Sequence, residues 1–455
     1  MSSSLFGTDG VRGIANETLT PELAISLVRS GAVFFSEVAA TSTGALAVGR
    51  DTRRSGDMLF GAVVAGITSA GFDVVDLGTV PTPGVAHAAA NDPNVIGGVV
   101  ISASHNPVEY NGIKFFNQHG KKLRVEEEQI IESQMDRHAV SRPIGRHLGR
   151  VVPGTRQVYA YLDGLLTALD LSSESLKGLR VAIDCANGAG YRLGPAAFEQ
   201  AGAIVSVLNA NPDGDNINAD CGSTHPQDLV GAMLSGGYDV GFALDGDADR
   251  LIAVSPSGRV FDGDDVLYII ACWLLRQGRL RDRKVVTTVI NNRGLDASLG
   301  RLGVSVIHCA VGDREIMHRM EDEAACLGGE TSGHILMGDY ASTGDGILTA
   351  LAIARAMQDE DASISELLQG LEKYPQIVIN VPVNDKEGFS TDEVIASAVK
   401  EAQAKLAPKG RILVRPSGTE PVIRVLVEGP SEDMVRRIAE RLATVVGERL
   451  GLDCA

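Results

Sequence analysis

The sequence predicts an α/β protein with three related α/β domains and a smaller C-terminal α+β domain. Its length of 455 residues corresponds to about three or four domains. A strand–helix–strand pattern recurs three times, and crossover units of this kind imply mainly parallel sheets. The unequal spacing of the three copies argues against a solenoid. The last part of the chain follows a different pattern.

The three copies share one order of residue types. A β-branched run leads into a polar turn, an apolar helix, a small residue or leucine with glycine, and a second apolar run. The first strands lie at residues 45–48, 181–183 and 285–290, and the second strands at residues 74–75, 204–208 and 304–307. The helix runs to about Ser69 in the first copy and to about Gln200 in the second, and it ends before Leu302 in the third.

The segment after about Leu371 predicts the α+β domain. It contains an apolar run at 377–379, a helix rich in Ala and Glu at about 392–406, strands at 411–415 and 422–427, and a final helix. Ser431 precedes that helix as its expected N-cap. We therefore expect four domains, at residues 1–150, 151–255, 256–370 and 371–455.

The composition excludes several classes of protein. Apolar residues make up 44% and charged residues 22%, which is typical of a folded globular chain and not of a disordered one. The formal net charge of −17 makes nucleic acid and anionic membranes unfavourable partners. No apolar run reaches the roughly 20 residues of a membrane span, and the start shows no secretory pattern. The six cysteines form no C-x-x-C pair, so we expect reduced thiols and a cytoplasmic protein.

A metal site is predicted at Asp245, Asp247 and Asp249, between two apolar runs. Carboxylates at alternate positions of an extended segment share a face, where they repel one another unless a cation binds. Oxygen ligands favour Mg²⁺. A calcium-binding EF-hand is excluded, because Arg250 and Pro256 stand where that loop needs Gly and Glu. A phosphatase with Asp245 as nucleophile and a solvated acidic turn are the alternatives.

A nucleophile is predicted at Ser104, where an apolar strand runs out into the turn Ser104-His105-Asn106-Pro107. Because His105 is adjacent in the sequence, we expect its side chain to diverge from that of Ser104. The turn therefore does not indicate the Ser–His pair of acyl transfer. Taken alone, this turn would equally suit a structural role.

Three further segments have the composition of ligand-binding loops. Residues 415–421, with Arg424 after them, combine arginines, hydroxyls and a glycine turn that suit a phosphate, although an ordinary charged hairpin is an alternative. Residues 328–334 place Glu330 and Ser332 on one face, where they can hold sugar hydroxyls, and a tight structural turn is equally compatible. Residues 6–13 contain three glycines and Phe6, which favour an ordered loop over a frayed terminus.

Together and in this order, the five segments resemble the α-D-phosphohexomutase superfamily. The match covers nearly the whole chain, and its most specific pieces are residues 101–107, 245–250 and 415–421. The resemblance implies four domains around a central cleft and a phosphoserine at Ser104. The metal loop has Ala248 where the superfamily usually has Gly. We expect this change to be harmless, because only acidic side chains and one arginine need to point inward.

The resemblance also implies an isomerase that interconverts glucosamine 6-phosphate and glucosamine 1-phosphate, on the route to UDP-N-acetylglucosamine and peptidoglycan. Related phosphomannomutase/phosphoglucomutases usually carry Met at the position of Thr331, and their activity is the alternative within the superfamily. A Mg²⁺-dependent phosphatase and a non-catalytic sugar-phosphate sensor are the alternatives outside it. Glucosamine 1,6-bisphosphate would be intermediate and activator, and a kinase or self-phosphorylation would install the phosphate. The resemblance permits a monomer or a homodimer.

Each site residue has a role by this resemblance. Phosphorylated Ser104 transfers its phosphoryl group, and Asp245, Asp247, Asp249 and an oxygen of the phosphoserine hold Mg²⁺. Arg12 and Arg250 neutralise charge, and Lys114 or His334 handles the proton; we expect nearby cations to lower the pKa of Lys114. Glu330 and Ser332 hold the sugar. The non-reacting phosphate is clamped by Arg415, Ser417, Gly418, Thr419 and Arg424.

Overall fold

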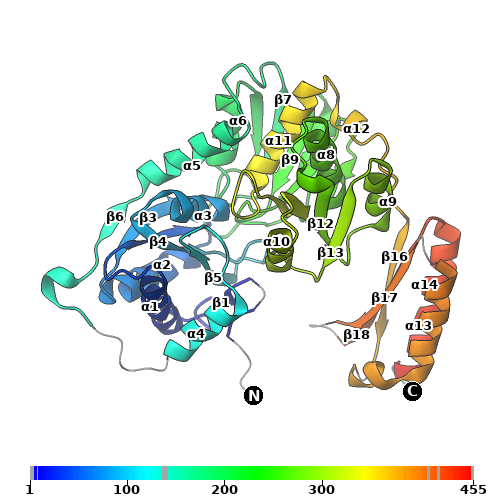
Figure 1. The fold of residues 1–455 in the computed structure, drawn as a ribbon, viewed down its shortest axis with the longest axis horizontal. Helices are drawn as coiled ribbons and strands as arrows, with labels where there is room; N and C mark the ends of the chain where they lie inside the picture. Colours follow the sequence, from blue (N-terminus) through cyan, green and yellow to red (C-terminus); the bar gives the residue numbers. More distant parts are fainter. Residues whose placement is uncertain are drawn as a thin grey trace. The chain divides into compact units, whose positions relative to one another are not determined.

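The computed structural model describes residues 5–7, 9–135, 142–384, 386–406, 410–417 and 421–451, and the strands of these residues form four sheets (Figure 1). Three sheets mix parallel and antiparallel pairs and are combined with helices, and the fourth is antiparallel. The predicted fold class is therefore confirmed. The chain forms two compact units, residues 1–290 with 307–369 and residues 291–306 with 370–455.

The first sheet has six strands in the order β1-β5-β4-β2-β3-β6. Its strands are β1 (Val11–Ile14), β2 (Ala45–Arg50), β3 (Asp73–Thr79), β4 (Val95–Ile101), β5 (Tyr110–Asn117) and β6 (Val151–Pro153). Its helices are α1 (Pro21–Val38), α2 (Ser55–Ser69), α3 (Thr82–Asn91) and α4 (Val125–Met135). Leu27 and Leu59, from α1 and α2, pack with Val99 on one face, and Val85 of α3 packs with Val100 on the other. Because both faces are covered, β4 is buried along its whole length and reads as a continuous apolar run.

The second sheet has the order β11-β10-β9-β7-β8. Its strands are β7 (Arg180–Asp184), β8 (Ile204–Leu208), β9 (Val240–Leu244), β10 (Leu251–Val254) and β11 (Val260–Phe261), with helices α5 (Thr155–Ala168), α6 (Leu193–Gln200) and α7 (Gln227–Ser235) nearby in the chain. The parallel pairs β7–β8 and β7–β9 follow from the crossover connections. β9 and β10 pair antiparallel, so the predicted metal loop is the connection between them.

The third sheet has the order β13-β12-β14-β15. Its strands are β12 (Lys284–Thr288), β13 (Ser305–Cys309), β14 (Leu327–Gly329) and β15 (Ile335–Met337). The helices of this part of the sequence are α8 (Gly263–Arg276), α9 (Arg293–Arg301), α10 (Asp313–Asp322), α11 (Gly346–Asp359) and α12 (Ile364–Leu367). The predicted strand–helix–strand order is thus present in all three copies. Nearly all residues of α8 and α11 are buried, which agrees with their apolar composition.

The fourth sheet has the order β16-β18-β17 and carries α13 and α14 on one face (Figure 1). Its elements are β16 (Gln376–Pro382), β17 (Arg411–Pro416), β18 (Val422–Glu428), α13 (Glu393–Leu406) and α14 (Glu432–Leu450). Val425 of β18 and Leu442 of α14 belong to the core between these layers. Ser431 occupies the predicted N-cap position of α14, but its side chain makes no capping hydrogen bond. Among the described residues, no helix is both long and apolar enough to cross a membrane.

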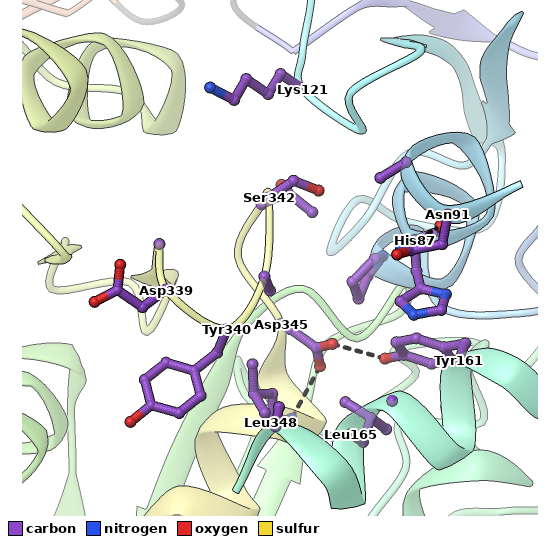
Figure 2. A pocket seen from close by; sticks show the side chains of 17 residues that line it. His87, Asn91, Lys121, Tyr161, Leu165, Asp339, Tyr340, Ser342, Asp345 and Leu348 are labelled. Carbon is purple, nitrogen blue, oxygen red and sulfur yellow. Dashed lines mark hydrogen bonds between the residues drawn. The ribbon is translucent and has the colours of Figure 1, made fainter. Parts of the chain in front are cut away.

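Helix α11 begins at a buried carboxylate. Asp345 Oδ1 accepts hydrogen bonds from the backbone N–H groups of Ile347 and Leu348 at 2.9 and 3.0 Å, and Oδ2 accepts one from the Tyr161 hydroxyl at 2.8 Å. Figure 2 shows Asp345 and Tyr161 at the edge of a cavity of about 360 Å³. Burial raises the pKa of Asp345 to about 6. The next residue, Gly346, donates its backbone N–H to the carbonyl of Ala248 at 3.0 Å, so this helix end supports the metal loop.

We expect Asp345→Asn to remove part of the pH dependence of stability. The folded pKa of about 6 lies above the ordinary value of 3.8, so the folded chain binds this proton more tightly than the unfolded chain. The carboxyl therefore contributes stability that is fully present below pH 3.8 and is lost as the pH rises through 6. The side-chain oxygen of Asn keeps the cap. Urea unfolding measures the free energy of unfolding of the wild type minus that of the variant. This difference should be about 2–3 kcal/mol larger at acidic pH than at alkaline pH.

The matched control is Asp339→Asn, which neutralises an exposed carboxylate in the same loop. Its effect on stability measures the removal of one carboxylate charge from this loop without a change to the cap of α11. An Asp345→Asn difference that is constant between about pH 4 and pH 8 would show that this carboxyl titrates alike in the folded and unfolded chains.

Candidate active site

The predicted nucleophile lies in the turn after β4. Ser104 adopts a left-handed backbone conformation with φ of 52°, and its hydroxyl donates a hydrogen bond to Asp245 Oδ2 at 2.6 Å. Its side chain is completely buried. Gly246 allows this approach, because a Cβ at that position would lie 2.5 Å from the Ser104 carbonyl oxygen. The structure therefore brings the serine and the metal loop into direct contact.

The expectation that the His105 side chain diverges from that of Ser104 is wrong. His105 Nδ1 lies 3.3 Å from Ser104 Oγ, because the left-handed residue at 104 interrupts the alternation of an extended chain. Burial and the charges of Arg250 and Arg12 lower the pKa of His105 to about 4, so the imidazole is neutral near pH 7. Sequence reasoning therefore missed His105 as a member of the site.

The predicted metal loop is a tight turn and not an extended segment. Ala248 has φ of 58°, and its N–H donates to the carbonyl of Asp245 at 3.0 Å. The carboxylates of Asp245, Asp247 and Asp249 still converge, with ligand atoms within 4.8 Å of one another. The extended geometry was wrong, and the turn brings the three acids together instead. Ala248 also occupies a conformation that costs a non-glycine residue about 1–2 kcal/mol.

The three carboxylates suit a hard divalent cation. All three are nearly fully buried, and Oδ1 of Asp247 and of Asp249 have no hydrogen-bond partner among the described residues. Burial and the neighbouring Asp249 and Asp247 raise the pKa of Asp245 well above its ordinary value. Burial acts in the same direction on Asp249, but Lys114 and His334 outweigh it and lower that pKa. Buried carboxylate oxygens of this kind fit Mg²⁺.

Lys114 lies in β5 with its ammonium among three carboxylates. Its Nζ is 2.7 Å from Asp247 Oδ2, 3.0 Å from Asp9 Oδ2 and 3.8 Å from Asp249 Oδ2. Burial would lower the pKa of Lys114, but Asp247 and Asp9 outweigh it and raise the pKa above the ordinary value. The expectation of a lowered pKa is therefore wrong for the charges that the chain itself supplies.

The N-terminal loop completes a partly buried network of alternating charges. Arg12 and Lys122 both contact the carboxylate of Asp9, and Lys122 also contacts Asp313. His334 places Nε2 3.5 Å from Asp313 Oδ2 and Nδ1 3.6 Å from the metal-loop residue Asp249. Burial would lower the pKa of His334, but these two carboxylates raise it. Sequence analysis did not single out Lys122, which joins segments far apart in the chain.

The predicted sugar loop and Arg250 face a common cavity of about 480 Å³. Glu330 accepts a hydrogen bond from the Ser332 hydroxyl at 2.6 Å, so these two predicted residues are in contact. Arg250 donates its backbone N–H to Asp245 Oδ1 at 3.1 Å, and its Nε lies 3.8 Å from Asp249 Oδ1. The cavity is lined by residues that include Asp9, Arg12, His105, Asp249, Arg250, Asp313 and Glu330.

The predicted phosphate loop belongs to the second unit. Arg415 and Arg424 lie directly opposite each other on β17 and β18. Ser417 is buried, and its carbonyl accepts a hydrogen bond from Lys386 Nζ at 3.0 Å, which places a third cation at this end of the sheet. Sequence analysis did not single out Lys386. The predicted residues Gly418 and Thr419 lie outside the described residues.

Four protein-family models match the chain in succession. They are described as phosphoglucomutase/phosphomannomutase alpha/beta/alpha domains I, II and III, at residues 3–141, 159–258 and 262–374, and the C-terminal domain, at residues 378–445. These matches agree with the resemblance found in the five sequence segments.

Full-length relatives show the same family. The phosphoglucosamine mutase of Clostridium novyi (strain NT) is 44% identical over 449 residues, which cover 98% of this chain and 99% of the relative. That of Clostridium botulinum (strain Alaska E43 / Type E3) is 46% identical over 446 residues, or 97% and 98% of the two chains. A solved phosphoglucomutase/phosphomannomutase family protein from Burkholderia thailandensis has a TM-score of 0.81 at 25% identity, with 98% of each chain covered. The chain therefore belongs to the phosphoglucomutase/phosphomannomutase family, a group of isomerases within the α-D-phosphohexomutase superfamily.

Proposed function

We propose that this enzyme interconverts glucosamine 6-phosphate and glucosamine 1-phosphate through a phosphoserine at Ser104. The observation that carries the proposal is the 2.6 Å hydrogen bond between Ser104 Oγ and Asp245, which sets a hydroxyl against a cluster of three carboxylates. The identity of 44–46% to phosphoglucosamine mutases supports this substrate. The five cysteines that the structure describes are free, which agrees with a reducing cytoplasm.

The reaction moves one phosphoryl group in each half. Phosphorylated Ser104 transfers its phosphoryl group to the free hydroxyl of the bound sugar monophosphate, so the serine P–O bond breaks as the sugar P–O bond forms. The 1,6-bisphosphate then turns over in the cavity and returns its other phosphoryl group to Ser104. Mg²⁺, held by Asp245, Asp247, Asp249 and a phosphoserine oxygen, would neutralise negative charge on the transferred group.

The surrounding residues position the sugar and balance charge. Arg12 and Arg250 line the cavity and attract the phosphosugar locally, although the chain as a whole is acidic. Lys114 is held protonated by its carboxylate neighbours, which favours charge neutralisation over action as a base. We assign proton transfer to His334, which lies between Asp249 and Asp313. Glu330 and Ser332 hold sugar hydroxyls.

The second unit would hold the phosphate that does not react. Arg415, Ser417 and Arg424 gather basic and hydroxyl groups at one end of the fourth sheet, and Gly418 and Thr419 complete the loop by family resemblance. The domain boundaries of this proposal lie near residues 150, 255 and 370. Glucosamine 1,6-bisphosphate would then serve as the activator that phosphorylates Ser104.

The proposal predicts that Ser104→Ala abolishes both phosphorylation and turnover. Intact-mass measurement should find a phosphate on the wild type and none on the variant, because no other residue carries it. Interconversion of the glucosamine phosphates should fall at least about 10³-fold, since the covalent intermediate cannot form. Ser235→Ala, at the exposed end of α7, should change neither result. An active Ser104→Ala enzyme would rule out the phosphoserine route.

Removal of Mg²⁺ should stop turnover and lower the melting temperature of the wild type, because three buried carboxylates then repel one another. Adding Mg²⁺ back should stabilise the protein by about 3 kcal/mol at roughly 100 times its dissociation constant. Asp245→Asn should lose this Mg²⁺-dependent gain. In chelator it should melt no lower than the wild type, because the amide relieves the repulsion. Its oxygen still accepts from the Arg250 backbone N–H, and the Ser104 hydroxyl turns to accept from its NH2 group. Equal Mg²⁺ stabilisation of both proteins would place the ion elsewhere.

Substrate choice separates the glucosamine assignment from the alternative phosphomannomutase/phosphoglucomutase activity. We expect kcat/KM for glucosamine 6-phosphate to exceed that for mannose 6-phosphate or glucose 1-phosphate by at least about tenfold. Thr331, which bonds Asp264 at 3.2 Å, supplies a polar residue beside Glu330. Coupled assays with each sugar phosphate, at the same Mg²⁺ concentration, provide the comparison. A preference for mannose or glucose phosphate would keep the family assignment and overturn the substrate.

A further inference from the structure

Arg53 lies in the turn between β2 and α2, and its side chain has no exposed surface. The side-chain N–H groups of Arg53 donate to oxygens of the protein itself, which leaves its guanidinium turned to the chain and not to a substrate. A buried guanidinium requires partners for its donors. The identity of these partners points to a function for Arg53 in the catalytic turn.

The Arg53 guanidinium bonds four carbonyl groups of one turn. Its NH2 group donates to the carbonyls of Ser104 at 2.9 Å and Asn106 at 2.8 Å. Its NH1 group donates to the carbonyl of Tyr110 at 3.0 Å and to that of Pro107. The planar fork of an arginine spans these acceptors, whereas a lysine ammonium is a single point charge.

Arg53 also holds the backbone N–H of Ser104, through Asp51 and Ser102. Arg53 Nε donates to Asp51 Oδ2 at 2.8 Å, and the same oxygen accepts the Ser102 hydroxyl at 2.6 Å. Ser102 Oγ in turn accepts the Ser104 backbone N–H at 2.9 Å. Both backbone polar groups of Ser104 are therefore tied, directly or through Ser102 and Asp51, to one buried arginine, and the Ser104 carbonyl also accepts from Asn218 Nδ2 at 2.9 Å.

These bonds hold Ser104 in a conformation that it would not adopt freely. Its φ of 52° is left-handed, which costs a non-glycine residue about 1–2 kcal/mol. Without the bonds to its carbonyl and N–H groups, the residue would relax toward negative φ. That change would carry Oγ away from Asp245, although the carboxylates themselves would stay in place.

We propose that Arg53, acting with Asp51 and Ser102, is a positioning residue that holds Ser104 left-handed and aims its oxygen at the metal loop. The inference rests on the proposed function, in which Ser104 carries the phosphoryl group. Arg53 touches neither the sugar nor the phosphoryl group. It acts through the backbone of the catalytic turn, so its loss should affect transfer and not substrate binding.

The test compares Arg53→Lys with Arg54→Lys in the Mg²⁺-loaded full-length enzyme. Arg54 is the neighbour in sequence, but it is largely exposed and pairs with Asp215. For Arg53→Lys, kcat with glucosamine 6-phosphate should fall about 100-fold, because small displacements of reacting atoms are that costly, while KM should stay within about twofold. Arg54→Lys should leave both constants unchanged. An Arg53→Lys kcat within about threefold of the wild type overturns the proposal.

A second measurement tests the stability of the turn independently of the reaction. Hydrogen exchange at the amides of residues 102–111 should accelerate at least about tenfold in Arg53→Lys, while exchange in the rest of the first sheet stays unchanged. Unchanged exchange in this turn would overturn the proposal that Arg53 holds the turn, even if activity falls. If the wild type shows no turnover on any sugar phosphate, the proposed function fails, and this exchange experiment still decides whether Arg53 holds the turn.

Ser102→Ala provides a second test of the proposal in case Arg53→Lys does not fold. It removes one hydroxyl and leaves the guanidinium in place, so the fold should persist. It should lower kcat about tenfold with little change in KM, and it should accelerate exchange at the amide of Ser104. If Arg53→Lys does not fold and Ser102→Ala shows wild-type kcat and exchange, the proposal is overturned.

Discussion

The close approach of two backbone turns, one after β4 and one between β9 and β10, is the constraint on which the rest of this site depends. Gly246 lies against the Ser104 carbonyl, where a side chain would collide. Each turn contains a non-glycine residue with positive φ, Ser104 in one and Ala248 in the other. The fold accepts this local strain because β4 and β5 of the first sheet hold the ends of one turn, and β9 and β10 of the second sheet hold the ends of the other.

Electrostatics explain why the turns need such support. Three carboxylates with little access to water would drive each other apart, and the chain offsets them with buried cations from distant segments. Lys114 comes from β5, and Lys122 follows that strand and joins Asp9 to Asp313. The pKa of Asp249 is lowered and that of Asp245 is raised, so the negative charge is uneven across the cluster. A divalent cation would remove this imbalance.

Local sequence patterns were sufficient for the fold and for the acids. The alternation of apolar runs with helical stretches gave β2 and α2 close to their observed bounds and located β3, although the predicted strand was shorter than Asp73–Thr79. These elements depend on burial that the periodicity records. The three aspartates were recognised from their spacing, but the extended geometry assumed for them was wrong. A residue with positive φ leaves no clear signal in the sequence when it is an alanine, as Ala248 is.

Long-range pairs could not be predicted in this way. Arg53 meets the carbonyls of residues 104–110, and Lys122 meets Asp313, whose position is 191 residues away. Nothing near either residue in the sequence indicates these partners. Arg53 meets its partners only when β2 pairs with β4 in the first sheet, and Lys122 meets Asp313 only when the segment after β5 packs against α10. His105 was misjudged for a local reason: the direction of its side chain follows from the backbone of Ser104, which no side-chain pattern records.

The complete burial of the Ser104 hydroxyl has a consequence for the enzyme in its unmodified form. Asp245 and His105 both lie within hydrogen-bonding distance of this oxygen. If Ser104 carries the phosphoryl group as proposed, a molecule without that group would have no exposed hydroxyl for a phosphate donor to reach. Phosphorylation of Ser104 would then begin with a local opening of the turn after β4. The same small movement would decide how long the enzyme stays unphosphorylated and when it becomes active again.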